Sequence, residues 1–292
     1  MRVIEIQGGF GLDRLALVER PDRDPGPGEV AIAMRAASLN YRDLMTVLGT
    51  YNPKQRLPLV PCSDGVGVVE AVGAGVDRVR VGDRVATVFA QRWLGGEATR
   101  ERARSTLGGP LDGVLQERLV LPADGVVLVP SHLTDAEAAT LPCAAVTAWS
   151  AVVEQGQIRA GATVLVQGSG GVSLFALQFA KLAGARVVAT TSSPEKAERL
   201  RALGADEVID YRENPQWGTR VRELTNGQGV DLVVEIGGAG TLAQSLAAVR
   251  FGGAIALVGI LAGNAAEIPL TSIFMQNVRV LGILVGSRDA FE

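Results

Sequence analysis

The chain is poor in the residue types from which disulfide frameworks and many metal sites are built. It has two cysteines, Cys62 and Cys143, and a single histidine, His132. Two cysteines are too few for a disulfide framework and are typical of a protein kept in a reducing compartment. We therefore expect a cytoplasmic protein.

Strong charge and long apolar runs are also missing. The formal net charge is −3, so we expect neither nucleic acid nor an anionic membrane surface as a partner. No apolar stretch reaches the roughly 20 residues that cross a bilayer. Residues 1–10 also lack the apolar run of a signal peptide. The composition is that of a globular protein.

The first part of the chain predicts a β-rich domain. With 292 residues, 47% of them hydrophobic, the chain is long enough for two domains. Residues 91–112 are polar and are expected to form a loop, and one helix is expected from Tyr41 to Leu48. Glycine turns separate short apolar runs, which indicates a small barrel-like fold. The expected strands are Val3–Ile6, Leu15–Val18, Glu29–Ala37, Gly65–Val72, Arg84–Val88 and Glu117–Leu121.

The second part predicts strands that alternate with helices. Thr134 and Glu137 form a capping-box pattern that begins a helical link. The alternation beyond it is typical of a doubly wound parallel sheet, so the fold class is α/β. The expected strands are 163–167, 185–191, 207–210, 230–235, 254–258 and 278–285, and the expected helices fall near 171–183, 194–203, 214–226 and 240–249.

A glycine turn between the first of these strands and its helix predicts a dinucleotide site. Gly168 allows a tight turn, and Gly170 lets the backbone approach a pyrophosphate at the helix N-terminus. Ser173 stands where a third glycine or alanine is usual. An incidental turn is the alternative in a chain with 36 glycines, but the strand before it and the helix after it favour the dinucleotide.

The next strand end favours NADP(H), with NAD(H) as the alternative. An NAD site usually has an acid there for the ribose 2′-OH, and this chain has none. Ser192 and Lys196 could hold a 2′-phosphate instead. Ser193 and Pro194 could equally well just begin a helix, and both interpretations can hold together.

Landmarks along the whole chain resemble the medium-chain dehydrogenase/reductase superfamily, and most closely its zinc-free quinone oxidoreductase-like branch, often named zinc-type alcohol dehydrogenase-like. The resemblance implies a GroES-like substrate domain over residues 1–125 and a Rossmann domain over residues 126–292. It also implies hydride transfer from a nicotinamide to a small-molecule substrate in the cleft between the domains. The landmarks are residues 27–30, 40–43, 65–69, 81–85, 141–143, 147–149, 203–206 and 209–211, together with the glycine turn.

Catalytic zinc is not expected. Zinc-dependent members of the family have Cys, Gly-His-Glu and a later Cys, and only Cys143 matches. The first position falls within Asn40–Asp43, and the second reads Cys62-Ser63-Asp64, so Ser63 replaces the histidine. Three protein ligands are needed for catalytic zinc. A structural zinc lobe is missing as well, because residues 91–112 contain no cysteine.

The resemblance also implies site residues. Tyr41 and Tyr51 would face the cofactor pocket as candidate proton donors, with Asn40 and Thr147 beside the nicotinamide; packing at the domain seam is the alternative for both tyrosines. The expected cofactor-binding residues are Gly168, Ser169, Gly170, Gly171 and Val172 at the pyrophosphate, Ser192, Lys196 and Tyr211 at the 2′-phosphate, and Gly237, Gly259, Ile260 and Leu261 at later strand ends.

The chain ends earlier than its relatives. They usually continue past Gly286–Arg288 and return to the substrate domain, so this segment is expected to be missing after Glu292. The last Rossmann strand, Val278–Val285, pairs across a dimer in relatives, which implies a homodimer.

Three functions remain open at this point. The leading one is an NADPH-dependent reductase of a quinone, an enone or a related small carbonyl compound, working without zinc. The second is an NAD(P)-dependent alcohol dehydrogenase. The third is a non-catalytic NADPH-binding protein.

Overall fold

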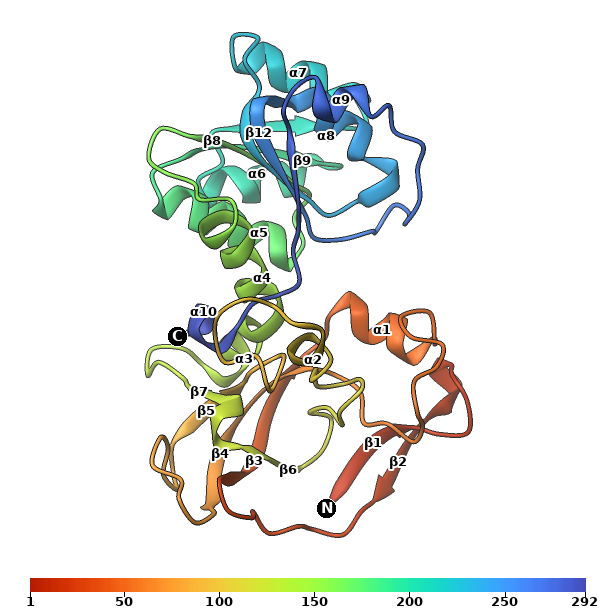
Figure 1. Cartoon of the computed structure of the whole chain (residues 1–292), viewed down its shortest axis with the longest axis vertical. Coiled ribbons are helices and arrows are strands. Elements are labelled where there is room, and N and C mark those ends of the chain that lie inside the picture. Colours follow the sequence, from red (N-terminus) through yellow and green to blue (C-terminus); the bar gives the residue numbers. More distant parts are fainter. The chain divides into compact units, whose positions relative to one another are not determined.

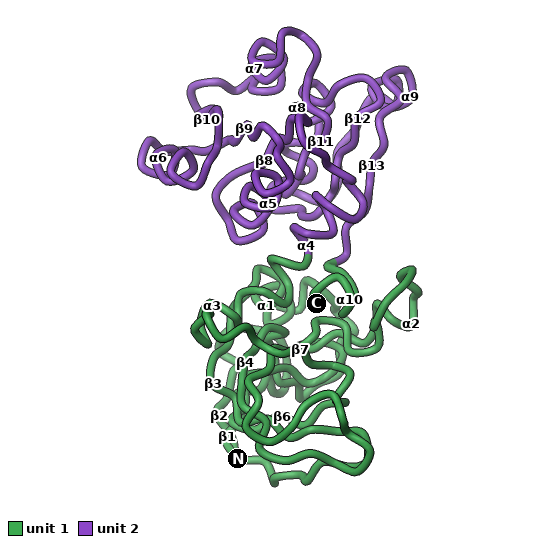
Figure 2. The backbone as a smooth tube through the Cα atoms, turned by 90° about the vertical axis from the view of Figure 1, so that its left-hand side faces the viewer, with its two compact units in different colours: residues 1–146, 285–292 green, residues 147–284 purple.

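The computed structural model describes all 292 residues, which form two compact units (Figure 2). Unit 1 comprises Met1–Val146 and Val285–Glu292, and unit 2 comprises Thr147–Leu284. The division falls later than the predicted boundary after residue 125. The reason is that β7 (Val126–Leu128) pairs with β5 (Arg84–Thr87), which keeps the following segment on the unit 1 sheet.

Unit 1 is built on antiparallel strands, as the sequence predicted (Figure 1). A five-stranded sheet has the order β6-β3-β4-β5-β7, and β1 and β2 form a separate pair. All six predicted strands are confirmed within two residues at each end, whereas β7 was not predicted. The remaining strands are β1 (Arg2–Ile6), β2 (Leu15–Glu19), β3 (Glu29–Ser38), β4 (Asp64–Val72) and β6 (Arg118–Pro122).

The helices of unit 1 are short. The predicted first helix is confirmed as α1 (Tyr41–Val47), and residues 91–112 contain only α2 (Arg100–Ala103). The Thr134 hydroxyl accepts from the Glu137 amide and begins α3 (Asp135–Ala139), as the capping box predicted. The chain continues as π-helix from Leu141 to Ala145, and the unit ends with α10 (Arg288–Phe291).

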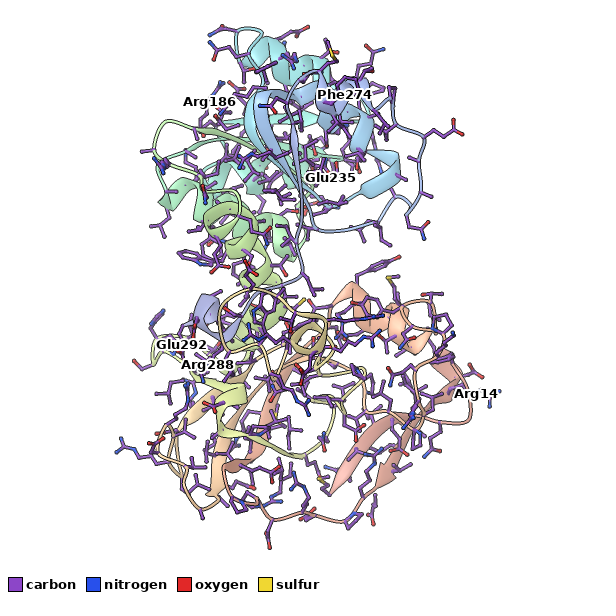
Figure 3. The ribbon with its side chains drawn as sticks, in the orientation of Figure 1. Arg14, Arg186, Glu235, Phe274, Arg288 and Glu292 are labelled. Carbon is purple, nitrogen blue, oxygen red and sulfur yellow. The ribbon has the colours of Figure 1, made fainter.

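The last eight residues pack on unit 1, although the sequence placed them with the second domain. The Arg288 and Asp289 amides donate to the carbonyls of Trp93 and Leu94, each at 2.9 Å. The Arg288 guanidinium also donates to Asp124 at 2.8 Å, and Glu292 pairs with an arginine of the same unit (Figure 3). These contacts tie the end of the chain to the loops around β7.

Unit 2 is a six-stranded parallel sheet with the order β10-β9-β8-β11-β12-β13 (Figure 1). The chain moves outward from β8 in both directions, so the topological switch point lies between β8 and β11. The predicted doubly wound fold is confirmed. The strands are β8 (Thr163–Gln167), β9 (Arg186–Thr191), β10 (Glu207–Asp210), β11 (Val230–Glu235), β12 (Val249–Leu257) and β13 (Arg279–Gly282).

The helices of unit 2 also follow the prediction. β13 is shorter than the predicted strand over 278–285, because beyond Ile283 the chain leaves the sheet and Val285 adopts a left-handed φ of 43°. No helix in either unit is long and apolar enough to cross a membrane. The helices of the unit are α5 (Gly171–Leu182), α6 (Pro194–Ala202), α7 (Trp217–Leu224), α8 (Leu242–Ala248) and α9 (Thr271–Phe274), after α4 (Val146–Trp149) at the junction.

Candidate functional site

The glycine turn after β8 has the geometry that a pyrophosphate site requires. Gly168 has a φ of +71°, a left-handed conformation that favours glycine, and its amide donates to the Thr190 carbonyl at 2.9 Å. Gly170 begins α5, and a Cβ added to it would meet no protein atom within 4 Å. The space beside Gly170 is therefore open, as close approach of a ligand to the backbone requires.

Ser173, at the position of the usual third glycine, serves the turn in another way. Its side chain is fully buried, and the hydroxyl donates to the Gln167 carbonyl at 2.6 Å. The first turn of α5 is thereby tied to the end of β8. The departure from the glycine pattern keeps the strand and the helix together.

The end of β9 carries hydroxyl groups and no acid. Thr191 Oγ1 is buried and has no hydrogen-bond partner. The Tyr211 amide donates to the Thr191 carbonyl at 3.0 Å, which brings Tyr211 beside the segment that contains Ser192. Lys196 is exposed in the first turn of α6, and Ser193 caps that helix by accepting from the Lys196 amide at 3.3 Å. Ser193 thus acts as the predicted cap, and Lys196 remains available.

The loops after β11 and β12 lie against each other. The Leu261 amide donates to the Ile236 carbonyl at 3.1 Å, and a Cβ on Gly259 would come within 2.7 Å of the same carbonyl oxygen. Gly237 is buried, whereas Ile260 and Leu261 are exposed. The residues predicted to bind the cofactor therefore stand at the carboxyl ends of strands in unit 2 or in the first turn of the helix that follows, at the edge where ligands of such sheets bind.

A buried carboxylate, which the sequence did not indicate as functional, organises this edge. Glu235 ends β11 and is fully buried (Figure 3). Its Oε1 accepts from the amides of Gly237 and Gly238 at 2.8 and 2.9 Å and from the Thr241 hydroxyl at 2.6 Å. The carboxylate therefore fixes the loop that follows β11.

The other oxygen of Glu235 connects β11 to the strand that carries the glycine turn. Glu235 Oε2 accepts from Gln167 Nε2 at 2.7 Å and from the Ser245 hydroxyl. Gln167 Oε1 in turn accepts from the Ile236 amide at 3.2 Å. An acid at the end of the apolar run Val230–Glu235 was the available signal, because such a group must find donors when buried.

Unit 1 has a separate cluster of buried acids around Asp64. Ser63 donates to Asp64 Oδ1 at 2.6 Å, and the Cys143 amide donates to Oδ2 at 2.9 Å. Burial nevertheless raises the pKa of Asp64 to about 6. The side-chain amide of Asn40 is near enough to Asp64 to favour its ionised form. Asn40 Nδ2 nevertheless makes no hydrogen bond of good geometry.

Asp43 and Cys62 share this environment. Burial raises the pKa of Asp43, although the Asn40 amide N–H donates to it at 2.8 Å. Burial and the neighbouring Asp43 carboxylate raise the pKa of the Cys62 thiol, which donates to the Ser38 carbonyl at 3.1 Å. The cluster therefore favours the protonated forms of its groups.

Three of the four predicted catalytic residues lie beside this cluster in unit 1. Tyr41 begins α1 and is 55% exposed, and Tyr51 is 47% exposed. The Arg42 guanidinium lies 5.1 Å from the centre of the Tyr51 ring and donates to the Leu107 carbonyl. Thr147, the fourth, is the first residue of unit 2.

The side chains do not form a metal site. No group of three or more His, Cys, Asp or Glu side chains is arranged to hold a metal ion. The Cys62 thiol is buried against a carbonyl, and His132 is exposed in the link. A catalytic zinc needs three protein ligands, and no three of these side chains are placed together.

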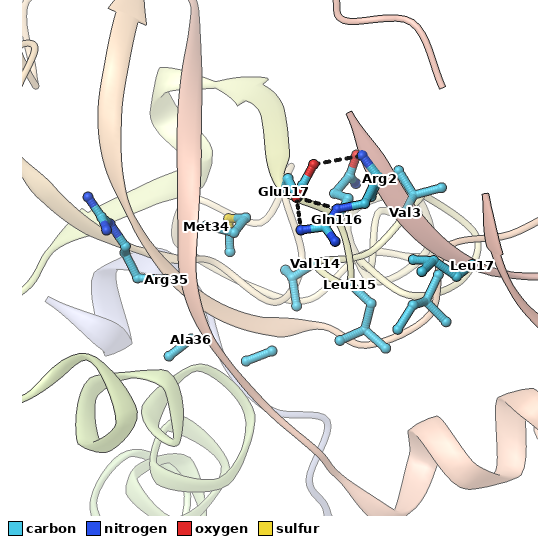
Figure 4. A pocket seen from close by; sticks show the side chains of 12 residues that line it. Arg2, Val3, Leu17, Met34, Arg35, Ala36, Val114, Leu115, Gln116 and Glu117 are labelled. Atoms are coloured by element: carbon cyan, nitrogen blue, oxygen red, sulfur yellow. Dashed lines mark hydrogen bonds and ion pairs between the residues drawn. The ribbon is translucent and has the colours of Figure 1, made fainter. Parts of the chain in front are cut away.

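A hollow with a mostly apolar lining lies in unit 1, apart from these residues. A pocket of about 310 Å³ lies between β1, β3 and residues 114–117 (Figure 4). Arg2 and Glu117 pair across its edge at 2.5 Å, and none of the four predicted catalytic residues lines it.

Two family models match the chain. One describes an alcohol dehydrogenase GroES-like domain and matches residues 26–131, and the other describes a zinc-binding dehydrogenase and matches residues 171–292. A zinc-type alcohol dehydrogenase-like protein of Schizosaccharomyces pombe is 45% identical over 272 residues, which are 91% of this chain and 79% of that protein.

Solved structures agree with this assignment. A protein described as an alcohol dehydrogenase of Sinorhizobium meliloti is 44% identical with a TM-score of 0.89, covering 99% of this chain and 86% of that one. An NAD-dependent alcohol dehydrogenase is 36% identical with a TM-score of 0.90, at the same coverage. A quinone oxidoreductase of Pseudomonas syringae is 30% identical with a TM-score of 0.83, covering 99% and 84%. The chain belongs to the medium-chain dehydrogenase/reductase superfamily and is an NAD(P)-dependent oxidoreductase.

Proposed function

We propose that the chain is an NADPH-dependent reductase that transfers hydride to a quinone, an enone or a related small carbonyl compound without zinc. The observation that carries the proposal is the segment Cys62-Ser63-Asp64, where zinc-dependent relatives have Gly-His-Glu. Its side chains are buried and bonded to Ser38, to Asp64 and to the Cys143 amide, so they have no common point at which a metal could be held. A substrate that accepts hydride without a Lewis acid suits such a site.

Cofactor choice follows from the end of β9. Ser192, Lys196 and Tyr211 offer hydrogen-bond donors and one positive charge to a 2′-phosphate. The end of β9 itself has no carboxylate, and Asp210 stands beside Thr191 at the end of β10. Thr191 Oγ1, which is buried without a partner, is a further polar group at this end of the strand. The NAD-dependent structural neighbour keeps NAD(H) as the alternative.

The remaining binding residues follow the strand ends of unit 2. The open space at Gly170 and the free amides of Gly171 and Val172 would receive the pyrophosphate, with Gly168 and Ser169 shaping the turn. Gly237, Gly259, Ile260 and Leu261 would line the nicotinamide half. The bound nicotinamide supplies the hydride.

Residues of unit 1 would handle the proton. The Tyr41 phenol is exposed at the start of α1 and can donate to a substrate oxygen or carbon, with Tyr51 as the second candidate. Asn40 would position the substrate, and Thr147 would pack beside the nicotinamide. Water can supply the proton where the substrate needs little acid assistance.

An alcohol dehydrogenase is the second candidate. The names of the yeast relative and of two structural neighbours favour it, and the family model over residues 171–292 describes zinc-binding enzymes. Zinc content distinguishes the two. The reductase retains full activity after chelation, whereas a zinc-dependent dehydrogenase loses it and recovers it with added zinc.

We also propose that the chain forms a homodimer through β13. This strand pairs only with β12, so its other edge is unpaired, and Val280 on it is 43% exposed. A molar mass near twice that of the chain in sedimentation equilibrium supports the dimer, and a monomer at micromolar concentration contradicts it.

The first experiment is a fluorescence titration of the full chain with NADPH and with NADH, followed by a screen of quinones, enones and alcohols. Tighter binding of NADPH and turnover of a quinone or enone support the proposal. Turnover of alcohols only favours the dehydrogenase, and binding without any turnover favours a non-catalytic binding protein. Tyr41→Phe and Tyr51→Phe then show which phenol acts, because the catalytic one lowers kcat without a matching change in cofactor Kd.

A further inference from the structure

Glu235 is a negative charge that unit 2 holds without a cation. It is the only fully buried acid of that unit, and no lysine, arginine or histidine forms an ion pair with it. A buried charge of this kind is unfavourable unless hydrogen bonds replace its hydration. Five donors do so here, three on Oε1 and two on Oε2.

The hydrogen-bonding pattern is that of an ionised carboxylate. Gly237 and Gly238 present amide N–H groups, which can only donate. Gln167 presents Nε2, because its Oε1 is turned toward the Ile236 and Gly237 amides. The hydroxyls of Thr241 and Ser245 complete the set as donors, so all five partners are matched by a carboxylate that carries no proton.

The position of this charge relates it to one half of the cofactor. A doubly wound sheet binds one mononucleotide on each side of the switch point. The strand after the glycine turn, β9, takes the adenosine ribose, so β8–β10 form the adenosine half and β11–β13 the nicotinamide half. Glu235 ends β11, directly beneath the loop 236–241 that opens the nicotinamide half.

We infer that Glu235 makes unit 2 bind the oxidised cofactor more tightly, relative to the reduced one, than a neutral residue would. The two cofactor forms differ by one hydride, so the oxidised nicotinamide ring carries one positive charge more than the reduced ring. A fixed negative charge in a site shielded from water stabilises the positive ring. Hydride release to a substrate then becomes more favourable, which suits a reductase. The inference rests on the proposed placement of the cofactor along the strand ends of unit 2.

The test is the ratio of two dissociation constants, for NADPH and for NADP⁺, measured by titration calorimetry on the full chain. Glu235→Gln should lower the ratio Kd(NADPH)/Kd(NADP⁺) by about 5- to 15-fold, the order of magnitude expected for the removal of one unit charge at an effective dielectric constant near 20. The loss should fall mainly on NADP⁺. A purely structural role would weaken both cofactors alike and leave the ratio unchanged.

Thr241→Val is the matched control. It removes one donor to Oε1 and keeps the charge, so the ratio should stay within about twofold of the wild-type value. An unchanged ratio in Glu235→Gln, or an equal fall in Thr241→Val, would overturn the inference.

A double variant covers the case in which Glu235→Gln does not fold. Gln167→Glu combined with Glu235→Gln moves the negative charge from β11 to β8, one strand toward the adenosine half. Residue 167 keeps the Ile236 amide as a donor, and residue 235 keeps the amides of Gly237 and Gly238, so every acceptor still has a donor. The ratio should fall at least about twofold, because neighbouring strands lie about 4.8 Å apart. A wild-type ratio in this variant contradicts the inference alone, whereas a wild-type chain that binds neither cofactor contradicts the proposed function as well.

Discussion

The two units bury carboxylates in opposite ways. In unit 1, Asp64 accepts hydrogen bonds from Ser63 and from the Cys143 amide, and a second buried acid, Asp43, lies in the same cluster. In unit 2, Glu235 stands alone and receives five donors. Both Asp64 and Glu235 are fully removed from water.

The difference shows how the number of donors decides what a buried acid can do. Few donors and an acidic neighbour leave the charge of Asp64 poorly compensated, so burial raises its pKa to about 6 and a proton can come and go near neutral pH. A full set of donors instead makes Glu235 a permanent part of the loop structure. The same burial thus leaves Asp64 able to take up a proton near pH 6 and ties Glu235 into the loop that follows β11.

The largest expected effect tests whether cofactor binding depends on unit 2. Gly170→Val places a branched side chain in space that the protein leaves empty, so the fold should tolerate it while the pyrophosphate cannot approach. We expect the Kd for NADPH to rise by about 100-fold, or roughly 3 kcal/mol. Asp64→Asn in unit 1 is the control and should change that Kd by less than about threefold. Similar losses in both variants would contradict the division of roles.

The second prediction concerns the pH dependence that Asp64 gives to stability. Its pKa rises from the ordinary 3.8 to about 6 on folding, so between these pH values the folded chain holds a proton that the unfolded chain has released. Wild-type stability should therefore fall as pH rises from about 4 to about 6. Asp64→Asn removes this loss and should gain about 3 kcal/mol relative to wild type between pH 4 and pH 8.

Urea unfolding of both proteins at a series of pH values measures this gain. Asp43, whose pKa burial also raises, is present in both proteins, so the difference between the two curves reports Asp64 together with its coupling to Asp43. A constant difference across the pH range would show that folding does not raise the pKa of Asp64.

The third prediction is that the same chemical change has the opposite sign in unit 2. In Glu235→Gln the side-chain oxygen can still accept from Gly237, Gly238 and Thr241. The new side-chain NH₂ group then faces Gln167 Nε2, so two donors oppose each other. The variant should lose about 2 kcal/mol of unfolding free energy at pH 7, the usual cost of an unsatisfied buried donor. Urea unfolding at pH 7 and pH 5 checks the value, and Thr241→Val should lose less. Stabilisation by Glu235→Gln would mean that the five donors do not compensate the charge.

Most of the fold could be predicted from the sequence because strands and helices alternate regularly along unit 2. Its buried strands are rich in short apolar runs, and β8, β10 and β11 have the predicted bounds. β7 was missed because three residues are too short for a pattern, and pairing with β5 alone makes them a strand. The return of residues 285–292 to unit 1 depends on contacts with Trp93 and Leu94, which no local pattern indicates.

The candidate site was predictable where backbone conformation demands a residue type. The left-handed φ of Gly168 and the open space at Gly170 match a known pattern, so the glycine turn was found. Glu235 and Gln167 were not found, because an acid and an amide 68 residues apart meet only after β8 and β11 pair. For the same reason the pKa of Asp64 could not be predicted, since its burial comes from several distant segments.

The smallest expected effect tests the proposed 2′-phosphate site at the start of α6 in unit 2. Lys196 is exposed in the first turn of α6, so its ion pair with a 2′-phosphate would be partly screened by water. Lys196→Ala should therefore weaken NADPH by only about 5- to 10-fold, roughly 1 kcal/mol, and leave NADH unchanged. Arg199→Ala, on the same helix but further from the strand end, should change neither Kd. Equal weakening of NADPH and NADH by Lys196→Ala would place the lysine at the pyrophosphate instead, and no change for either would leave the 2′-phosphate to Ser192 and Tyr211.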